Sequence, residues 1–400
     1  MPIIFFGIWS EAIVEKNINK WIEIAGTPDV FSERDNHIMK YPTKLLGKYD
    51  VVSIDEALGR YPDADVWVTF FNPGSVPDML AEKLPPERIH FLEADLEWRK
   101  GCMELGNTLL YREGNFSLCS VGGRRTSINS SDPNSQRLAQ WKDLTTELIE
   151  NIRNERPNRC TECPRLKYGF WRKSVKLNRL IFDLDFKDDA CNFKCIYCRS
   201  NKKRNRVKSA EGALYLYDIL YQMSEMPEYD TDKLTVQLAN GDFAANEYCD
   251  EILDIFLKTK WKIILNSNLS IYNEKLAALI EDERISRIIT SLDAGTRETF
   301  KKVKQKDMFD NVLENLRKYP VSKIDLLLGY VFLENINDNE TDIDGFYEIV
   351  KEVGGVIRLS TDNESSYTKK MKELVLRLTN KAKTDGLKVN VDYSNITLKV

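Results

Sequence analysis

Histidine is scarce in this chain of 400 residues: only His37 and His90 occur, far apart in the sequence. Histidine-based catalytic triads, His-rich zinc sites and two-histidine iron sites are therefore poor candidates for its chemistry. No apolar run approaches the ~20 residues of a membrane-spanning helix. The opening residues, MPIIFFGIWSEAIVE, lack the basic start of a secretory signal. We therefore expect a cytoplasmic protein with no membrane partner.

A large excess of charge of one sign is also missing. The 58 basic and 62 acidic residues leave a formal net charge of −4. This balance argues against a nucleic-acid partner that would bind across the whole chain. A composition of 42% hydrophobic and 30% charged residues is typical of globular proteins, and the length suggests two or three domains.

Cysteine is the residue type that points to chemistry. The chain has eight of them, and they are Cys102, Cys119, Cys160, Cys163, Cys191, Cys195, Cys198 and Cys249. In a protein without an export signal, grouped thiols indicate metal ligands rather than disulfides. Cys249 stands apart within the predicted helix 246–258, where we interpret it as a small buried apolar residue.

Residues 1–95 alternate between strand and helix patterns, which predicts a parallel sheet of Rossmann type. A dinucleotide site of this fold requires a Gly-x-Gly-x-x-Gly turn after the first strand. Only Gly7 is present there, followed by Ile8, Trp9 and Ser10. The alternatives of a nucleotide site and of a docking domain without one both remain open.

A second series of strands and helices begins near residue 178 and predicts six βα units of a partial TIM barrel. The active site of such a barrel lies at the carboxyl ends of its strands. The whole chain therefore divides into a Rossmann-like domain (1–95), a small insert with a hairpin at 108–119 (96–177), the barrel (178–365) and a helix-and-strand extension (366–400). The predicted barrel strands are 180–186, 234–238, 262–265, 287–292, 324–332 and 356–359.

Three cysteines follow the first barrel strand at the spacing Cys191-x3-Cys195-x2-Cys198. Thiolates are soft ligands that suit iron–sulfur clusters or zinc. Three ligands rather than four would leave one iron of a cubane without a protein ligand, which a reactive site needs and a structural site avoids. A zinc knuckle is the alternative.

This motif, with the aromatic Tyr197 before its last cysteine, resembles the signature of the radical S-adenosylmethionine (SAM) superfamily over about residues 178–365. The resemblance implies that the three cysteines hold a [4Fe–4S] cluster and that SAM chelates its fourth iron. It further implies that a flavodoxin- or ferredoxin-like protein supplies an electron. Cleavage of SAM would then give a 5′-deoxyadenosyl radical that abstracts hydrogen from a substrate.

The resemblance also implies contacts to SAM. Asn240-Gly241-Asp242 stands where the family has Gly-Gly-Glu, with an acid facing the SAM amino group. Ser291 matches the serine of the family's Ser-Leu-Asp-Gly, and Lys304 stands where an arginine often faces the SAM carboxylate. Asn268 matches the asparagine of a common Thr-Asn-Gly turn, in a structural or a functional role.

A second group of cysteines lies before the barrel. Cys102-x11-Gly114-x4-Cys119 resembles the start of the SPASM and twitch domains of radical SAM enzymes, which usually follow the barrel. Together with Cys160-x2-Cys163, the resemblance implies an auxiliary [4Fe–4S] cluster. Zinc, or thiols without a metal, are the alternatives.

The substrate class follows less directly. The N-terminal domain resembles units that accompany sugar-modifying proteins, which favours a polar substrate such as a carbohydrate or small metabolite. Modification of a ribosomally made peptide and a non-enzymatic iron–sulfur or zinc protein are the alternatives. The basic run 202–208 and the loop 122–125 could each bind an anion or be solvated loops.

Overall fold

A computed structural model describes residues 1–7, 11–32, 44–69, 76–92, 96–112, 115–119, 127–128, 134–184, 191–198, 209–362 and 365–392. The chain divides into two compact units. Residues 1–106 and 142–176 form the first unit, and residues 107–141 and 177–400 form the second. The four domains expected from the sequence stay a prediction.

The first unit is built on a sheet whose strands follow the spatial order β3-β4-β2-β1-β5-β6. All neighbours are parallel except β3, which pairs antiparallel with β4 at the edge. Taken in chain order, the five parallel strands give the arrangement 3-2-1-4-5 of a doubly wound sheet, which confirms the predicted Rossmann-like fold. The strands are β1 Ile3–Phe6, β2 Val30–Ser32, β3 Lys44–Leu45, β4 Tyr49–Val52, β5 Asp65–Val68 and β6 Ile89–Phe91.

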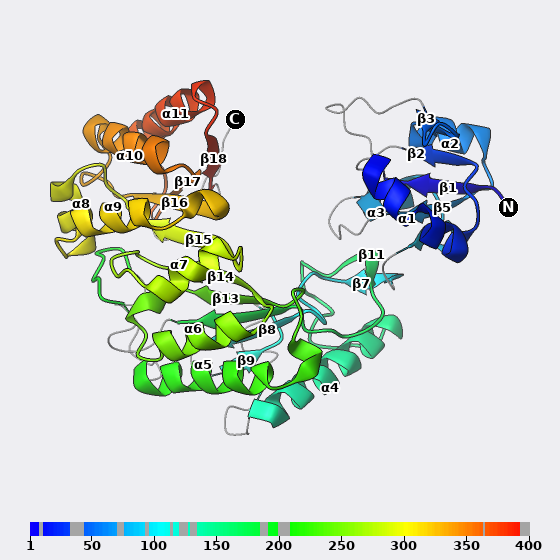
Figure 1. Cartoon of the computed structure of the whole chain (residues 1–400), viewed down its shortest axis with the longest axis horizontal. Helices are drawn as coiled ribbons and strands as arrows, with labels where there is room; N and C mark the ends of the chain where they lie inside the picture. The colour runs from blue at the N-terminus through cyan, green and yellow to red at the C-terminus, as the bar shows by residue number, and fades with distance from the viewer. Residues whose placement is uncertain are drawn as a thin grey trace. The chain divides into compact units, whose positions relative to one another are not determined.

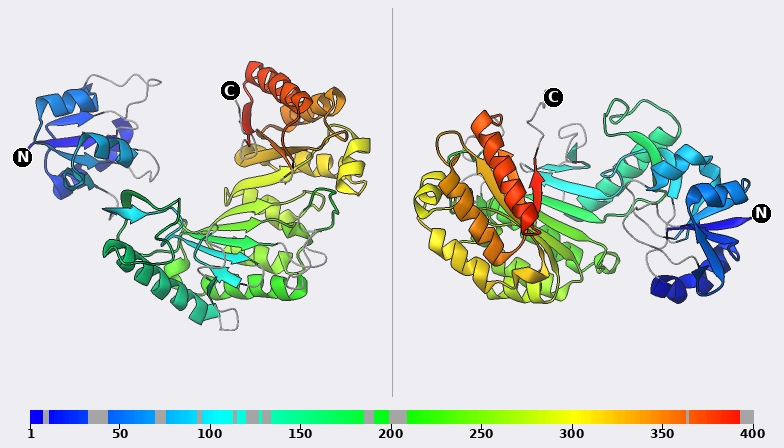
Figure 2. Two further views of the ribbon diagram at one scale, coloured as in Figure 1. Left: turned by 180° about the vertical axis from the view of Figure 1, so that it is seen from behind. Right: turned by 90° about the horizontal axis from the view of Figure 1, so that it is seen from above.

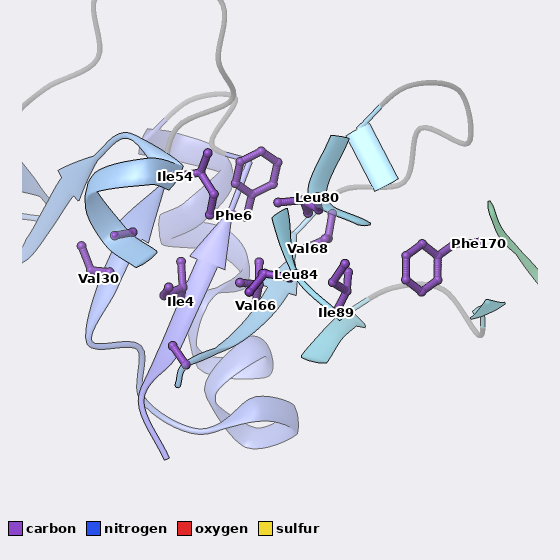
Figure 3. Packing of buried hydrophobic residues seen from close by; sticks show 12 residues of the cluster. Ile4, Phe6, Val30, Ile54, Val66, Val68, Leu80, Leu84, Ile89 and Phe170 are labelled. Carbon is purple, nitrogen blue, oxygen red and sulfur yellow. The ribbon is translucent and has the colours of Figure 1, made fainter. Parts of the chain in front are cut away.

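Strand β1 is apolar on both faces because helices cover both sides of this sheet. Ile4 and Phe6 point into the core under α2 (Ile54–Arg60) and α3 (Val76–Lys83), which Figure 3 shows from close by. Phe5 points the opposite way, where its ring meets the Trp21 ring of α1 (Glu11–Ala25) edge-on at 6.1 Å. A strand buried on both sides carries a continuous apolar run instead of alternation.

The first unit also contains a two-stranded antiparallel ribbon that the sequence patterns did not predict. Its strands are β7 (Leu96–Gly101) and β11 (Lys167–Arg172). A Cβ added at Gly101 would lie 2.6 Å from the Trp171 ring, so glycine leaves the space that this ring occupies over the ribbon. Helix α4 (Asn134–Arg153) lies between them in the chain.

The second unit is a ten-stranded sheet with the order β10-β9-β8-β12-β13-β14-β15-β16-β17-β18. The six predicted barrel strands are present and parallel, which confirms the partial barrel. Two further parallel strands extend it: β8 pairs with β12, and β18 from the C-terminal extension pairs with β17. The strands are β8 Thr108–Arg112, β9 Asn115–Ser117, β10 Ser127–Ile128, β12 Arg179–Asp183, β13 Thr235–Ala239, β14 Lys262–Asn266, β15 Ile285–Ser291, β16 Asp325–Phe332, β17 Val356–Thr361 and β18 Lys388–Val391.

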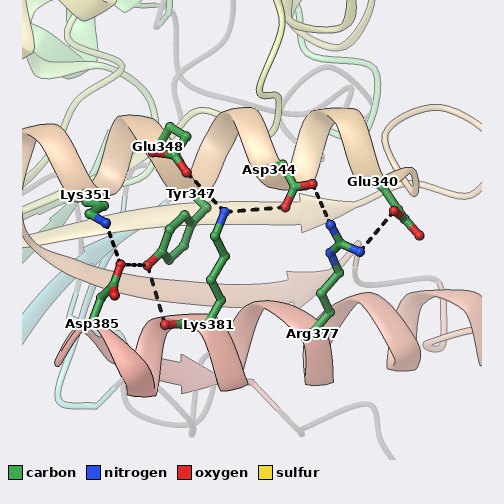
Figure 4. A network of polar contacts seen from close by, with 8 residues as sticks. All are labelled: Glu340, Asp344, Tyr347, Glu348, Lys351, Arg377, Lys381 and Asp385. Atoms are coloured by element: carbon green, nitrogen blue, oxygen red, sulfur yellow. Dashed lines mark hydrogen bonds and ion pairs between the residues drawn. The ribbon is translucent and has the colours of Figure 1, made fainter.

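Helices cover the convex face of this curved sheet (Figures 1 and 2). Alternate strand residues such as Val236 and Leu238 are buried beneath them, while the residues between point to the opposite face. The last two helices are joined by ion pairs such as Arg377 with Asp344 at 2.7 Å and Lys381 with Glu348 at 3.1 Å (Figure 4). The helices are α5 Ser209–Ser224, α6 Cys249–Lys258, α7 Glu274–Glu281, α8 Arg297–Lys304, α9 Phe309–Lys318, α10 Glu340–Val353 and α11 Lys369–Thr384.

The amphipathic pattern of residues 296–318 predicts one helix, and this prediction was wrong, because two helices, α8 and α9, occupy the segment. Gln305 adopts the left-handed conformation, with φ of 58°, and its N–H donates to the Lys301 carbonyl. This geometry ends a helix. None of the helices described in either unit has the length and apolar character needed to cross a lipid bilayer.

Candidate functional site

The three motif cysteines lie on a short loop, residues 191–198, that follows strand β12. All three thiols are half-buried. Burial raises the pKa of Cys191 and raises the pKa of Cys195 to about 11. The neighbouring thiols add to both pKa shifts.

Helix α8 holds one side of this loop through its final carbonyl groups. The Lys194 N–H donates to the Lys304 carbonyl at 3.2 Å, and the Ile196 N–H donates to the Val303 carbonyl at 3.0 Å. These carbonyls at a helix end have no partner within the helix. The Phe193 ring, which is buried, meets Phe300 edge-on at 5.8 Å. These contacts with α8 hold one side of the loop in place.

Asn268, after strand β14, holds the other side. Its amide donates to the Asn192 side-chain oxygen at 2.6 Å and to the Cys191 sulfur at 3.5 Å. Asn192 in turn donates to the Ser270 hydroxyl at 2.8 Å. The backbone N–H of Phe193 also donates to the Cys191 sulfur, at 3.4 Å. Asn268 thus contacts the cysteine loop directly.

The turn after β13 explains the departure from the family's Gly-Gly-Glu. Asn240 and Gly241 both adopt left-handed backbone, with φ of 56° and 58°. Glycine is favoured in this conformation, and asparagine tolerates it. The Asn240 amide also donates to Asp183 of β12 at 2.8 Å, which ties the ends of two neighbouring strands together.

Asp242 is turned into the interior by this bend and is 1% exposed. Its Oδ1 accepts hydrogen bonds from the Ser267 hydroxyl at 2.8 Å and the Asn268 N–H at 3.2 Å. Its Oδ2 has no hydrogen-bond partner among the described residues. Burial raises the pKa of this carboxyl, although those hydrogen bonds oppose the shift. An acidic oxygen of this kind suits a ligand ammonium group.

Ser291 ends strand β15 and pairs across the sheet with Gly329 of β16. A Cβ added at Gly329 would lie 2.4 Å from the Ser291 hydroxyl oxygen. The space around that hydroxyl therefore exists only because residue 329 is glycine. The Ser291 hydroxyl lies next to the position that a side chain at residue 329 would occupy.

Lys304 and Tyr197 meet at the buried carboxylate of Asp293. Its Oδ2 accepts a hydrogen bond from the Tyr197 hydroxyl and another from the Lys304 ammonium, each at 2.5 Å. Its Oδ1 accepts from the Val331 N–H at 2.7 Å. Asp293 is fully buried and Lys304 is 2% exposed. The role of Lys304 toward SAM stays a prediction, because the structure shows its ammonium bound to Asp293.

The three thiols on this loop are a donor set that suits a [4Fe–4S] cluster, and their assignment as its ligands stays a prediction. A cubane places each cysteine on a different iron, so its ligands need not converge on one point. Three thiolates are soft donors that match that chemistry.

The second group of cysteines is divided between the two units. Cys102, Cys160 and Cys163 belong to the first unit, and Cys119 belongs to the second. Cys160 and Cys163 share a tight turn in which the Cys163 N–H donates to the Cys160 carbonyl at 2.9 Å. Strands β8 and β9 form the predicted hairpin before Cys119. The assignment of these four residues as cluster ligands stays a prediction.

Cys249 is 8% exposed at the start of α6, and burial raises its pKa to about 12. This agrees with its interpretation as a buried apolar residue. All eight cysteines are present as thiols, without disulfides. The basic run 202–208, the loop 122–125 and the residues directly after Gly7 lie outside the described residues.

Sequence reasoning missed Asp293 and Asn192 as parts of the site. Both are short polar residues next to motif positions, Asp293 two residues after Ser291 and Asn192 directly after Cys191. In the sequence, the side-chain partners of Asn192 lie 76 residues or more away from it, and Tyr197 lies 96 residues away from Asp293. Adjacency to a motif was the only signal available.

Comparison with known proteins identifies this region. The family model for the Radical SAM superfamily matches residues 189–347, which contain the cysteine loop and the strand ends described above. This part of the chain is therefore a radical SAM domain, the domain of a class of enzymes that use a [4Fe–4S] cluster and SAM.

Curated relatives are similar to part of the chain. The GTP 3′,8-cyclase of Aliarcobacter butzleri is 26% identical over 182 residues, which is 45% of this chain and 55% of that protein. A probable GTP 3′,8-cyclase of Saccharolobus islandicus is 27% identical over 169 residues, covering 41% of this chain and 51% of that protein. The chain thus spans about half the length of these relatives.

Solved structures are more distant. Streptococcus suis SuiB bound to S-adenosylmethionine is 13% identical, with a TM-score of 0.41 over 66% of this chain and 57% of that chain. The enzyme anSMEcpe with bound AdoMet is 16% identical, with a TM-score of 0.37 over 54% of this chain and 64% of that chain. Likeness at this level says nothing about activity.

Proposed function

We propose that this protein is a radical SAM enzyme that cleaves SAM reductively and abstracts hydrogen from a polar small metabolite. The observation that carries the proposal is the pairing of two features at the carboxyl ends of the barrel strands. One is the loop with Cys191, Cys195 and Cys198, and the other is the buried Asp242, whose Oδ2 has no partner among the described residues. Asn268 joins the two by contacting both.

Each residue then has a defined task. The three thiolates hold the cluster, and Asp242 accepts the ammonium group of SAM through Oδ2. The Asn240-Gly241 turn orients that carboxylate, and Ser291 offers a hydroxyl beside Gly329. When bound, the cluster and SAM supply a one-electron cleavage that yields a 5′-deoxyadenosyl radical. The barrel residues position the reactants and exclude water.

A small polar metabolite, such as a nucleotide or carbohydrate, is the substrate class we favour. The GTP 3′,8-cyclases named above act, by their names, on a nucleotide, and they are similar to 45% and 41% of this chain. The Rossmann-like sheet of the first unit agrees with a small-molecule enzyme, since doubly wound sheets commonly bind such ligands. We further propose a cytoplasmic location, a flavodoxin- or ferredoxin-like reductant, and an auxiliary [4Fe–4S] cluster on Cys102, Cys119, Cys160 and Cys163.

Anaerobic reconstitution with iron and sulfide, followed by SAM and dithionite, tests the core of this proposal. We expect the parent protein to release 5′-deoxyadenosine, measured by liquid chromatography with mass detection. Cys195→Ala should reduce the product to the background level, because it removes one of three ligands. Cys249→Ala is the matched control and should behave as the parent, because this buried thiol lies outside the motif. A parent protein that binds zinc, or that holds a cluster but forms no 5′-deoxyadenosine, would overturn the proposal.

A further inference from the structure

Asp293 and Lys304 form a buried pair of opposite charges beside the cysteine loop. Removing a carboxylate and an ammonium from water is costly unless both are paired and hydrogen-bonded. Here both oxygens of Asp293 accept hydrogen bonds, and the Asn337 amide donates to its backbone carbonyl at 2.8 Å. Burial lowers the pKa of Lys304, but the Asp293 carboxylate together with the nearby thiols raises it overall. The lysine is therefore charged.

Both charges lie close enough to the loop to act on it. Lys304 is the last residue of α8, and its carbonyl accepts the N–H of Lys194. Its ammonium lies 5.6 Å from the centre of the Tyr197 ring, and Tyr197 precedes Cys198. The Tyr197 hydroxyl donates to the Asp293 carboxylate, so both charges contact the residue that precedes Cys198. The two charges thus lie beside the same part of the loop with opposite signs.

This arrangement also indicates how Lys304 acts. Two groups, Asp293 and Tyr197, already accept hydrogen bonds from its ammonium, at 2.5 and 3.3 Å. The side chain is 3% exposed. Such a group exerts its influence through the electric field at the loop rather than by binding a ligand from solvent. In a low-dielectric interior this field is screened less than it is at the surface.

We propose that Lys304 and Asp293 are positioning residues whose opposite charges each shift the reduction potential of the cluster on Cys191, Cys195 and Cys198, so that the potential depends on both charges being balanced. The inference rests on the proposed function, because it takes these three thiols as the ligands. One-electron reduction adds a negative charge to the site. The buried ammonium stabilises that charge, and the buried carboxylate opposes it.

Redox titration followed by electron paramagnetic resonance tests the pair in the reconstituted full chain, with dithionite as the reductant. Lys304→Met should lower the midpoint potential, and Asp293→Asn should raise it. We expect each shift to change the ratio of reduced to oxidised cluster at fixed potential about tenfold, which corresponds to about 59 mV for one electron. The double variant Asp293→Asn/Lys304→Met should return near the parent value, because it contains neither charge.

Two controls separate charge from packing. Lys304→Arg keeps the charge and should keep the parent potential. Tyr197→Phe removes a hydrogen bond to Asp293 but no charge, and should shift the potential by less than a third as much. If Lys304→Met assembles no cluster, the midpoint potentials of Asp293→Asn and of the double variant are compared with that of the parent. Neither of these two variants leaves a buried carboxylate unpaired.

Shifts of both single variants in the same direction, or no shift beyond that of Tyr197→Phe at parental iron content, would overturn the inference. Either result is distinguishable from failure of the proposed function. That failure would already appear in the parent as the absence of a reducible cluster or of 5′-deoxyadenosine.

Discussion

At the scale of single residues, Asp242 shows a conflict between stability and binding. Because burial raises the pKa of the Asp242 carboxyl, the folded protein keeps this proton to a higher pH than the unfolded chain does. The unfolded chain releases that proton near its ordinary pKa, so the folded state loses relative stability as the pH rises above about 4. The residue thus costs stability at neutral pH, as an acid kept for a cationic ligand would.

Asp242→Asn should therefore stabilise the fold while weakening SAM binding. The asparagine oxygen can still accept from Ser267 and Asn268, and no charge is buried. We expect a higher melting temperature at pH 7 and a smaller gain at pH 4, where more of the parent carboxyl is protonated. The Kd for SAM should rise about tenfold or more, because a charge-assisted hydrogen bond is lost.

Calorimetry on the reconstituted protein would measure both effects. Asp325→Asn is the matched control, since this exposed carboxylate pairs with Arg287 at the opposite end of the strands. A variant that binds SAM as tightly as the parent would show that Asp242 is not the ammonium acceptor.

The sequence predicted the residue types at this site better than their partners. The cysteine spacing and the acid after β13 could be recognised because each motif lies within a few residues. The Tyr197–Asp293–Lys304 contacts could not, because they join positions 11 to 107 residues apart. Lys304 matched a family arginine by alignment alone, and only the structure places it against Asp293.

At the scale of elements, helix α8 and the cysteine loop behave as one piece of structure. Within the loop the Cys198 N–H donates to the Cys195 carbonyl at 3.0 Å, and the Lys194 and Ile196 N–H groups donate to the last two carbonyls of the helix. Prediction of one helix across 296–318 hid this feature, because an amphipathic pattern runs through both α8 and α9. The left-handed Gln305 that separates them carries no strong sequence signal, since glutamine is an ordinary helix residue.

Phe193→Ala should loosen the loop in the protein before any cluster is inserted. Truncating a buried phenylalanine costs about 3 kcal/mol or more, and here its partner is Phe300 of α8. We expect the amide hydrogens of Lys194 and Ile196 to exchange about 100-fold faster, measured by mass spectrometry of peptides covering 191–198. Ile196→Ala, at a side chain that is 40% exposed, should leave exchange nearly unchanged. Equal exchange in both variants would show that the ring contact does not anchor the loop.

At the scale of the whole molecule, we propose two clusters per chain, the second on the cysteines that precede the barrel. Both sheets follow from the alternation of strand and helix patterns in the sequence. The ribbon of β7 and β11 does not, because its short strands carry exposed Trp98 and Tyr168 without a clear alternating pattern. That ribbon ends next to Cys102, so the surroundings of the second cysteine group were the least predictable part of the chain.

Counting iron tests the auxiliary cluster directly. Two [4Fe–4S] clusters would give about eight irons per reconstituted chain, and Cys102→Ala should retain about four. Far-UV circular dichroism should be unchanged, because neither sheet depends on that side chain for its apolar core. Cys249→Ala should retain about eight irons as the control. Equal iron in Cys102→Ala and the parent would remove Cys102 as a ligand.

The pairing of β8 with β12 has a practical consequence for dissecting this protein. The family match begins at residue 189, after β12, while the strand that covers the outer edge of β12 comes from residues 108–112. A fragment started at residue 178 would expose a row of backbone donors and acceptors along an apolar strand, and such edges recruit neighbouring molecules. Recombinant pieces meant to stay monodisperse should begin upstream of Asn107, well outside the segment that sequence similarity marks out.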